Sequence, residues 1–151
     1  MVRREGLTTA VTPLQPVDCT AFAPLCADAP DPWTERQLAA ELTKPTSRCF
    51  AARLGEEPVG FACFSLIGET AELETVAVKT ALRNRGIASA LLQQAFETLA
   101  AAGATRCLLE VRCSNAPALA LYRQLGFTQL ARRRGLFDRP REDGFTMELI
   151  F

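Results

Sequence analysis

The chain has 151 residues, of which 48% are hydrophobic and 23% are charged, so we expect residues 1–151 to form one globular domain with a substantial core. The 17 basic residues balance the 17 acidic ones, and this neutrality argues against non-specific binding to nucleic acid. No apolar run reaches the roughly 18–20 residues that span a bilayer, and the N-terminal segment MVRREGLTTAV lacks the apolar core of a secretory signal.

The first third of the chain is predicted to contain one strand and two helices. Residues 7–14 combine threonines with alternating apolar residues, which is typical of a strand. Residues 17–27 are predicted to form a helix that ends before two nearby prolines. Thr34 followed by Gln37 is a capping-box pattern, which opens a second helix that extends to about Leu42.

The middle of the chain is predicted to form three strands. Residues 48–54 and 59–67 are apolar runs on either side of a turn at residues 55–58, which contains a glycine and a proline. Residues 72–78 form the next strand.

The longest predicted helix comes next. Residues 86–102 carry apolar side chains at helical spacing, and Gly103 ends the helix. Residues 106–112 then form a strand, so the centre of the chain is a strand–helix–strand crossover.

The last part of the chain is predicted to contain one helix and two strands. Ser114 or Asn115 caps the helix, and Gly126 ends it. Strands at residues 128–134 and 145–150 are joined by a loop rich in arginine, aspartate and proline. The order of elements predicts a mixed α/β fold.

Six cysteines and no histidine restrict the chemistry that is open to the chain. The cysteines form no close C-x-x-C pair, so we expect no metal site, and they fit a reducing cytoplasm. Cys63 and Cys107 lie in apolar runs and are predicted to be core residues. Without histidine, Ser–His and Cys–His catalytic devices are absent, and acid–base chemistry falls to Glu, Asp, Tyr, Lys or Cys.

The segment at residues 76–92, VAVKTALRNRGIASALL, predicts an anion site. A strand runs into a helix whose first N–H groups are unpaired and carry the positive end of the helix dipole. Gly86 allows a ligand to approach the backbone, and Arg83 and Arg85 add charge that suits a pyrophosphate. The alternative is an ordinary strand-to-helix turn. A dinucleotide site is disfavoured because G-x-G-x-x-G requires more than this single glycine.

A second motif occupies residues 109–127, LEVRCSNAPALALYRQLGF. Together with the first, it resembles the GNAT acetyltransferase superfamily, and within it the RimI-type ribosomal-protein N-terminal alanine acetyltransferases. Weaker matches are PWTE at residues 32–35 and RED at residues 141–143. The resemblance implies a single GNAT fold, a mixed and mostly antiparallel twisted sheet flanked by helices, with acetyl-CoA as cosubstrate and no metal.

The resemblance also implies a cosubstrate site. The pantetheine arm would enter a gap between the strands that end at Val78 and Arg112, pair with the first strand, and bind Asn115, while the loop wraps the pyrophosphate. The implied residues are Val76, Ala77, Val78, Arg83, Asn84, Arg85, Gly86, Ile87, Ala88, Ser89 and Asn115. The alternative is that the two strands simply pair and Asn115 only caps a helix.

Two residues match the catalytic positions of the family. Glu110 matches the general base, and partial burial among its apolar neighbours would raise its basicity; the alternative is a surface carboxylate paired with Arg112. Tyr122, the only tyrosine, matches the general acid that protonates the departing CoA thiolate; the alternative is a packing role. The backbone N–H of Val78 would stabilise the oxyanion.

The acceptor implied by the resemblance is the N-terminal alanine of small-subunit ribosomal protein eighteen. An α-amine, with a pKa of about 8, is neutral far more often near pH 7 than lysine at about 10.4, which favours α-amine chemistry. The family usually carries two tyrosines after its late Arg-Arg pair, but here Arg132-Arg133 is followed by Arg134-Gly135-Leu136-Phe137. Peptide recognition would then use Phe137 or Asp138, and Phe22 and Trp33 would line the peptide groove. A small amine or a lysine side chain remains an alternative acceptor, and a non-catalytic acyl-CoA-binding regulator remains an alternative function.

Charge is unevenly spread along the neutral chain. Five arginines cluster near the C-terminus, and acidic residues lie early: Arg132, Arg133, Arg134, Arg139 and Arg141, and Asp28, Asp31, Glu35 and Glu41. This pattern fits a solvated hairpin and an acidic helix, or a face that docks an acidic or RNA-bearing partner.

Overall fold

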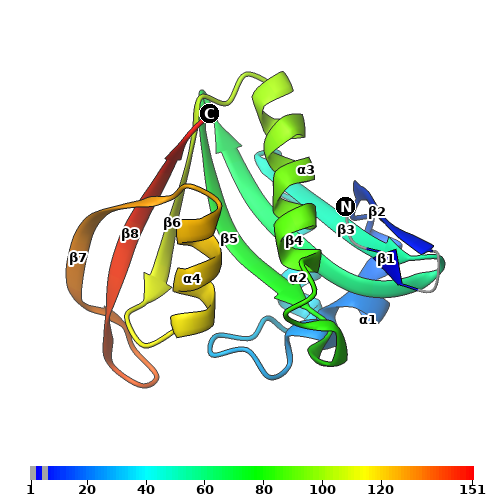
Figure 1. Ribbon diagram of the computed structural model, residues 1–151, viewed down its shortest axis with the longest axis horizontal. Helices are drawn as coiled ribbons and strands as arrows, with labels where there is room; N and C mark the ends of the chain where they lie inside the picture. The colour runs from blue at the N-terminus through cyan, green and yellow to red at the C-terminus, as the bar shows by residue number, and fades with distance from the viewer. Residues whose placement is uncertain (1–2, 5–6) are drawn as a thin grey trace.

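The computed structural model describes residues 3–4 and 7–151, which form an eight-stranded sheet in the order β1-β2-β3-β4-β5-β6-β8-β7 (Figure 1). The strands are β1 (Arg3–Arg4), β2 (Leu7–Pro13), β3 (Ser47–Leu54), β4 (Glu57–Ile67), β5 (Thr70–Val78), β6 (Arg106–Arg112), β7 (Thr128–Phe137) and β8 (Glu142–Ile150). The helices are α1 (Cys19–Phe22), α2 (Glu35–Leu42), α3 (Ile87–Ala101) and α4 (Ala116–Gln124), with short 3₁₀ turns η1 (Pro16–Asp18), η2 (Ala23–Cys26) and η3 (Thr80–Leu82). Every pairing is antiparallel except that of β5 with β6, so the expected mixed, mostly antiparallel sheet is confirmed.

Most of the predicted elements form where the sequence places them. The capping box that opens α2 is present: Thr34 Oγ1 accepts the N–H of Gln37 at 3.1 Å, and Gln37 Oε1 accepts the N–H of Thr34 at 2.8 Å. Strand β6 has the predicted bounds.

The prediction of one continuous helix over residues 17–27 is wrong. Only the single turn α1 is α-helical, and it lies between the 3₁₀ turns η1 and η2. Pro24 has no N–H to donate to the carbonyl four residues earlier, so the α-helical hydrogen bonds are interrupted at this residue. The final hairpin is also longer than predicted, since β7 and β8 leave a turn of only four residues, 138–141.

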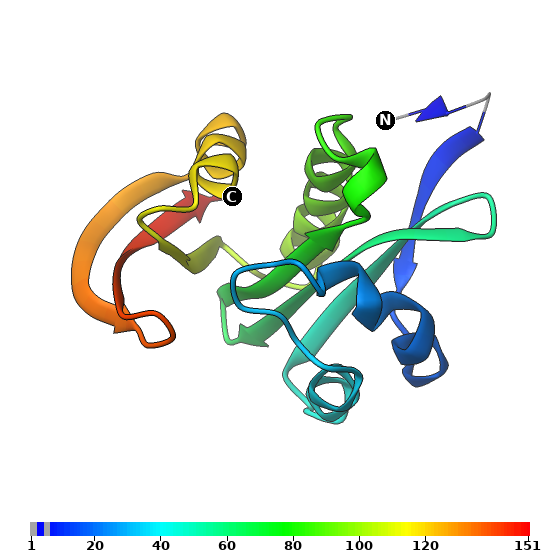
Figure 2. The ribbon, with the colours of Figure 1, turned by 90° about the horizontal axis from the view of Figure 1, so that it is seen from below.

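Two hydrophobic clusters lie on opposite faces of the sheet (Figure 2). One packs α3 and α4 against the sheet, with Leu91 and Phe64 fully buried. The other packs η2, α1 and α2 against β3 and β4, around Leu38 and Phe61. Cys63 and Cys107 are both fully buried, as predicted. None of the helices in the described residues has the length and apolarity that a membrane span requires.

The parallel pair at the centre of the sheet separates partway along. Strands β5 and β6 are in register from Thr70↔Arg106 to Leu73↔Leu109 and pair no further. Beyond that point β5 pairs only with β4, and β6 only with β8. We call the region between residues 74–78 of β5 and 110–112 of β6 the fork; Figure 1 shows the two strands diverging there. The expected gap between the strands is thus present.

Strand β7 forms one edge of the sheet. It pairs only with β8, and residues 128–134 are exposed throughout.

Candidate active site

The fork exposes backbone groups of β5 that have no strand partner. The N–H of Lys79 donates to the carbonyl of Val59 on β4 at 2.8 Å. Backbone groups in a strand alternate in direction, so those of Ala77 also point to β4, whereas those of Val76 and Val78 point into the fork. Of the three residues expected to bind the pantetheine arm through the backbone, only Val76 and Val78 therefore direct their backbone groups into the fork.

The loop after β5 forms a strained turn at the start of α3. Gly86 caps the helix with a φ of 78°, and Asn84 has a φ of 61°, a left-handed region that favours glycine. The N–H groups of Ile87, Ala88 and Ser89 have no acceptor within the described residues. Three unpaired donors at the positive end of a 15-residue helix fit the predicted anion site.

The two arginines of this loop differ in their contacts. Arg83 forms a bidentate pair with Asp28, with Nη2···Oδ1 and Nη1···Oδ2 distances of 2.8 and 2.9 Å, and its Nε donates to the carbonyl of Val78 at 3.2 Å. Hydrogen bonds from Arg83 and Thr80 lower the pKa of Asp28. The charge of Arg83 is thus paired with a carboxylate in the structure, and its binding to a pyrophosphate stays a prediction. Arg85 is exposed and has no carboxylate partner in the described chain.

Glu110 lies on the far side of the fork and is exposed. Its side chain is 39% accessible, and Oε2 lies 3.7 Å from Nη1 of Arg133. The expected burial is wrong, because α1 and α2 pack on β3 and β4, and α4 covers the opposite face of the sheet. The alternative pairing with Arg112 is wrong as well. Thr146 lies directly across from Glu110 on β8, and its Oγ1 is buried without a hydrogen-bond partner among the described residues.

Tyr122 is buried on α4, in the cluster on the α3 side of the sheet. Only 7% of the residue is accessible, and its ring centroid lies 5.7 Å from that of Phe127. Burial, with a smaller contribution from Cys107, raises the pKa of Tyr122 to about 12. The phenol is therefore neutral near pH 7 and retains its proton for donation. Glu110 and Tyr122 belong to opposite faces of the sheet, and no contact joins them; the fork is the opening between them.

Asn115 caps α4, as predicted. Its Oδ1 accepts the N–H of Ala118 at 3.3 Å. The amide NH₂ of Asn115 has no acceptor within the part of the chain that the structure describes. Capping therefore leaves the two amide donors available to a ligand.

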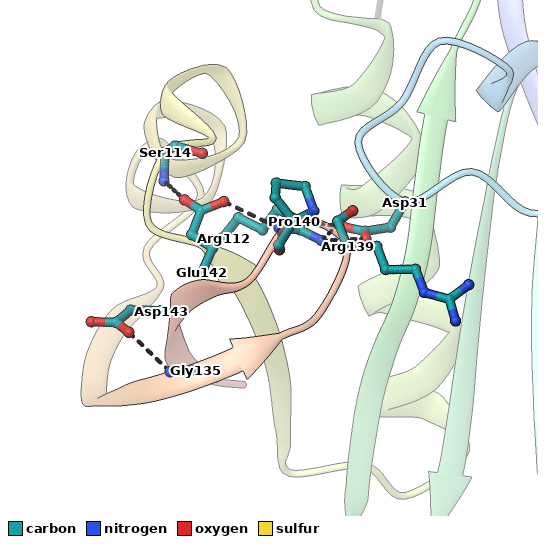
Figure 3. Close-up of polar contacts among 8 residues, drawn as sticks. All are labelled: Asp31, Arg112, Ser114, Gly135, Arg139, Pro140, Glu142 and Asp143. Atoms are coloured by element: carbon teal, nitrogen blue, oxygen red, sulfur yellow. Dashed lines mark hydrogen bonds and ion pairs between the residues drawn. The ribbon is translucent and has the colours of Figure 1, made fainter.

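A buried arginine cluster at the end of β6 was not foreseen from the sequence (Figure 3). The side chain of Arg112 is only 5% accessible. It binds both carboxylate oxygens of Asp31 at 2.9 Å and Oε1 of Glu142 at 3.2 Å. The Asp31 bonds raise the pKa of the guanidinium further above its ordinary value. The one sequence signal was a charged residue that ends an apolar strand.

The cluster also reaches the β7–β8 turn and α4. Arg112 donates to the carbonyls of Pro140 at 2.8 Å and Arg139 at 3.4 Å, and its guanidinium lies 4.7 Å from the ring centroid of Phe137. The other carboxylate oxygen of Glu142 accepts the N–H of Ser114 at 2.7 Å. These contacts join the end of β6 to the turn that follows β7 and to the residues that precede α4.

The aromatic residues expected in a peptide groove have other positions. Phe22 is 1% accessible and packs in the α1 core with Arg53 over its ring, so it lines no groove. Trp33 is half-buried and borders a surface hollow of about 330 Å³, whose other lining residues are Gln37, Ala40, Glu41 and Lys44. Apart from Trp33, no residue predicted for the site borders this hollow. The fork remains the better candidate site because its backbone groups are unpaired. Within residues 3–4 and 7–151, no group of three or more His, Cys, Asp or Glu side chains could hold a metal ion.

Comparison with known proteins finds one family. Residues 19–127 match the model of the acetyltransferase (GNAT) family. The chain is 36% identical over 121 residues to the N-alpha-acetyltransferase RimI of Mycobacterium tuberculosis, covering 78% of this chain and 75% of the relative. It is 32% identical over 120 residues to the ribosomal protein bS18-alanine N-acetyltransferase of Escherichia coli K12, covering 78% of this chain and 80% of the relative.

Solved structures show the same fold. The E. coli ribosomal-protein-S18-alanine N-acetyltransferase superposes with a TM-score of 0.86 at 28% identity, covering 95% of this chain and 94% of that one. Arabidopsis thaliana NAA60 in complex with acetyl-CoA superposes with a TM-score of 0.84 at 19% identity, covering 95% and 99%. The resemblance indicated by the two sequence motifs is confirmed.

Proposed function

The chain belongs to the GNAT acetyltransferase family, and on that premise we propose that it transfers acetyl from acetyl-CoA to the N-terminal α-amino group of a protein. The acceptor that we propose is the N-terminal alanine of ribosomal protein bS18, the substrate named for its E. coli relative. One observation carries the proposal: β5 has backbone groups without a strand partner along a fork that has the helix start of α3 at its mouth and Glu110 on its other side.

The fork supports binding of an extended arm. Backbone groups of Val76 and the N–H of Val78 can pair with pantetheine as a neighbouring strand would, while the Val78 carbonyl accepts a hydrogen bond from Arg83. The unpaired N–H groups at the start of α3, with Arg85 beside them, suit the pyrophosphate. The free amide donors of Asn115 lie at the start of α4, after β6.

The chemistry that we propose uses three groups of this chain. Glu110, directly or through a water molecule, takes a proton from the acceptor ammonium, and the free amine attacks the thioester carbonyl. The N–H of Val78 stabilises the oxyanion. As the carbon–sulfur bond breaks, Tyr122 gives its proton to the departing thiolate, since a phenol is protonated near pH 7.

The protonation states of the two kinds of amine favour an α-amine as the acceptor. With pKa values of about 8 and 10.4, about a tenth of α-amines but fewer than about one in a thousand lysines are neutral near pH 7. This difference favours the α-amine as the acceptor. The second candidate acceptor, a small amine or a lysine side chain, is supported by the altered loop, in which Arg134-Gly135-Leu136-Phe137 contains no tyrosine.

A non-catalytic acyl-CoA-binding regulator is the third candidate, and the presence of both Glu110 and Tyr122 argues against it. We place the protein in the cytoplasm, where its six unpaired cysteines would stay reduced.

Free-thiol release from acetyl-CoA tests the proposal. One peptide begins with alanine; a matched peptide has a blocked N-terminus and an internal lysine. Release with the first peptide alone supports α-amine transfer, and release with the second supports the lysine alternative. CoA binding without turnover on either peptide would contradict both and favour the regulator. Intact-mass measurement of ribosomal proteins from cells with and without this chain then tests bS18 as the acceptor.

A further inference from the structure

The loop between η2 and α2, residues 27–34, contacts both sides of the fork (Figure 2). On one side Asp28 binds Arg83 and Thr80, which lie after β5. On the other side Asp31 binds Arg112 at the end of β6. The two contacts are both bidentate arginine–carboxylate pairs, the geometry that fixes orientation as well as distance. The 27–34 loop therefore spans the open end of the fork.

Arg112 connects that loop to the second segment beside the fork, the β7–β8 turn. All three guanidinium nitrogens form hydrogen bonds: Nε and Nη2 to Asp31, and Nη1 to Glu142 and the carbonyl of Pro140. The partners lie 81 and 28–30 positions away in sequence, and Figure 3 shows them converging on one side chain. Among residues 3–4 and 7–151, Asp31 has no other hydrogen bond or ion pair that reaches the turn.

Glu110 lies two residues before Arg112 and on the same face of β6, because side chains in a strand alternate. The 27–34 loop and the β7–β8 turn therefore both lie beside the face of β6 that carries Glu110. The separation of these two segments is set at Arg112. A lysine at this position would keep the positive charge but would lack the planar set of N–H donors of a guanidinium.

We infer that Arg112 is a positioning residue for the acceptor: through Asp31 and the β7–β8 turn, it holds the two walls of the acceptor opening at a set separation. The inference rests on the proposed function. The proposed cosubstrate site consists of β5, the start of α3 and Asn115, and Asp31 bonds to none of these. Removing the Asp31 contact is therefore expected to affect the acceptor and to leave acetyl-CoA binding unchanged.

Asp31→Asn is the variant that tests the inference, since the Asp31 side chain is 54% accessible and the buried guanidinium of Arg112 keeps its ion pair with Glu142. Glu148→Gln is the control. It breaks the 2.9 Å ion pair between Arg106 and Glu148, which joins β6 to β8 at the end of β6 opposite to Arg112. Arg112→Lys is the second variant, and its folding is checked by thermal denaturation.

We expect Asp31→Asn to raise KM for an alanine-initiated peptide about tenfold, with kcat and the Kd for acetyl-CoA within about twofold of the wild type. Glu148→Gln should leave all three constants within about twofold. The Arg112→Lys variant, once shown to be folded, should have the same rise in KM for the peptide as Asp31→Asn. An unchanged acceptor KM in folded Asp31→Asn, or an equal loss of acetyl-CoA affinity, would overturn the inference while the proposed function stands. A wild type that acetylates no amine would overturn both.

Discussion

The protonation of Tyr122 offers a test that does not depend on turnover. Burial raises the pKa of this phenol to about 12, against an ordinary value of about 10. Between these values the unfolded chain loses the proton while the folded chain keeps it. The free energy of unfolding therefore falls as the pH rises through this window, and the stability present below pH 10 is lost once the pH passes about 12.

The magnitude follows from the two pKa values. One pKa unit is worth about 1.4 kcal/mol, so the full difference corresponds to about 3 kcal/mol. With Tyr122 7% accessible, solvent screening removes little of this energy. The comparison is between the wild type and Tyr122→Phe, each unfolded by urea at pH 9 and at pH 11. Burial also raises the pKa of Cys107 to about 12, but that thiol is present in both proteins and its contribution largely cancels.

We expect the wild type to lose roughly 1 kcal/mol more than Tyr122→Phe between pH 9 and 11. Because the chain has one tyrosine, the ultraviolet absorbance of tyrosinate reports its titration directly in the folded protein. Half-titration near pH 10 in a protein that is still folded, or the same pH dependence in both proteins, would refute the reasoning and remove the argument that the phenol is held neutral by burial.

Other variants test separate parts of the site. Tyr122→Phe and Glu110→Gln should each lower turnover by roughly 10²- to 10⁴-fold while acetyl-CoA affinity stays nearly intact; wild-type turnover in either variant would exclude that residue from the proton transfers. Gly86→Ala should weaken acetyl-CoA binding measured by calorimetry, because alanine is strained at a φ of 78°, whereas Gly103→Ala, with a φ of 103° and open space around it at the other end of α3, should cost similar stability without changing affinity. Thr146→Val should leave the free energy of unfolding unchanged or raise it by up to about 1 kcal/mol, since it removes a buried hydroxyl without a partner; a clear loss in urea denaturation would mean that the hydroxyl is hydrogen-bonded in solution.

Local patterns predicted local structure well. The start of α2 follows from Thr34 and Gln37, two residues whose side chains and N–H groups satisfy each other. The turn into α3 follows from Gly86, and the cap of α4 from Asn115. In each case the interaction joins residues within a few positions, so the sequence alone contains both partners.

Features that depend on distant partners could not be predicted in the same way. Nothing in the sequence pairs Arg83 with Asp28, 55 positions away, or Arg112 with Asp31, 81 positions away. The exposure of Glu110 was also missed, because apolar neighbours along a strand point to the opposite face and say nothing about what covers the residue itself. Burial there depends on where the helices pack, which is a property of the whole sheet.

The exposed edge at β7 has a consequence for how copies of this chain meet one another. A strand with one neighbour presents a row of unpaired N–H and C=O groups that a second molecule could extend into a continuous sheet. Here Arg132, Arg133 and Arg134 stand in succession along that edge. Arg132 pairs with Asp143 and Arg133 with Glu110, but two such edges brought together would still place arginines beside arginines. In a chain whose overall charge is zero, and which therefore has little long-range repulsion between molecules, this local arginine row is the feature that opposes self-association and aggregation.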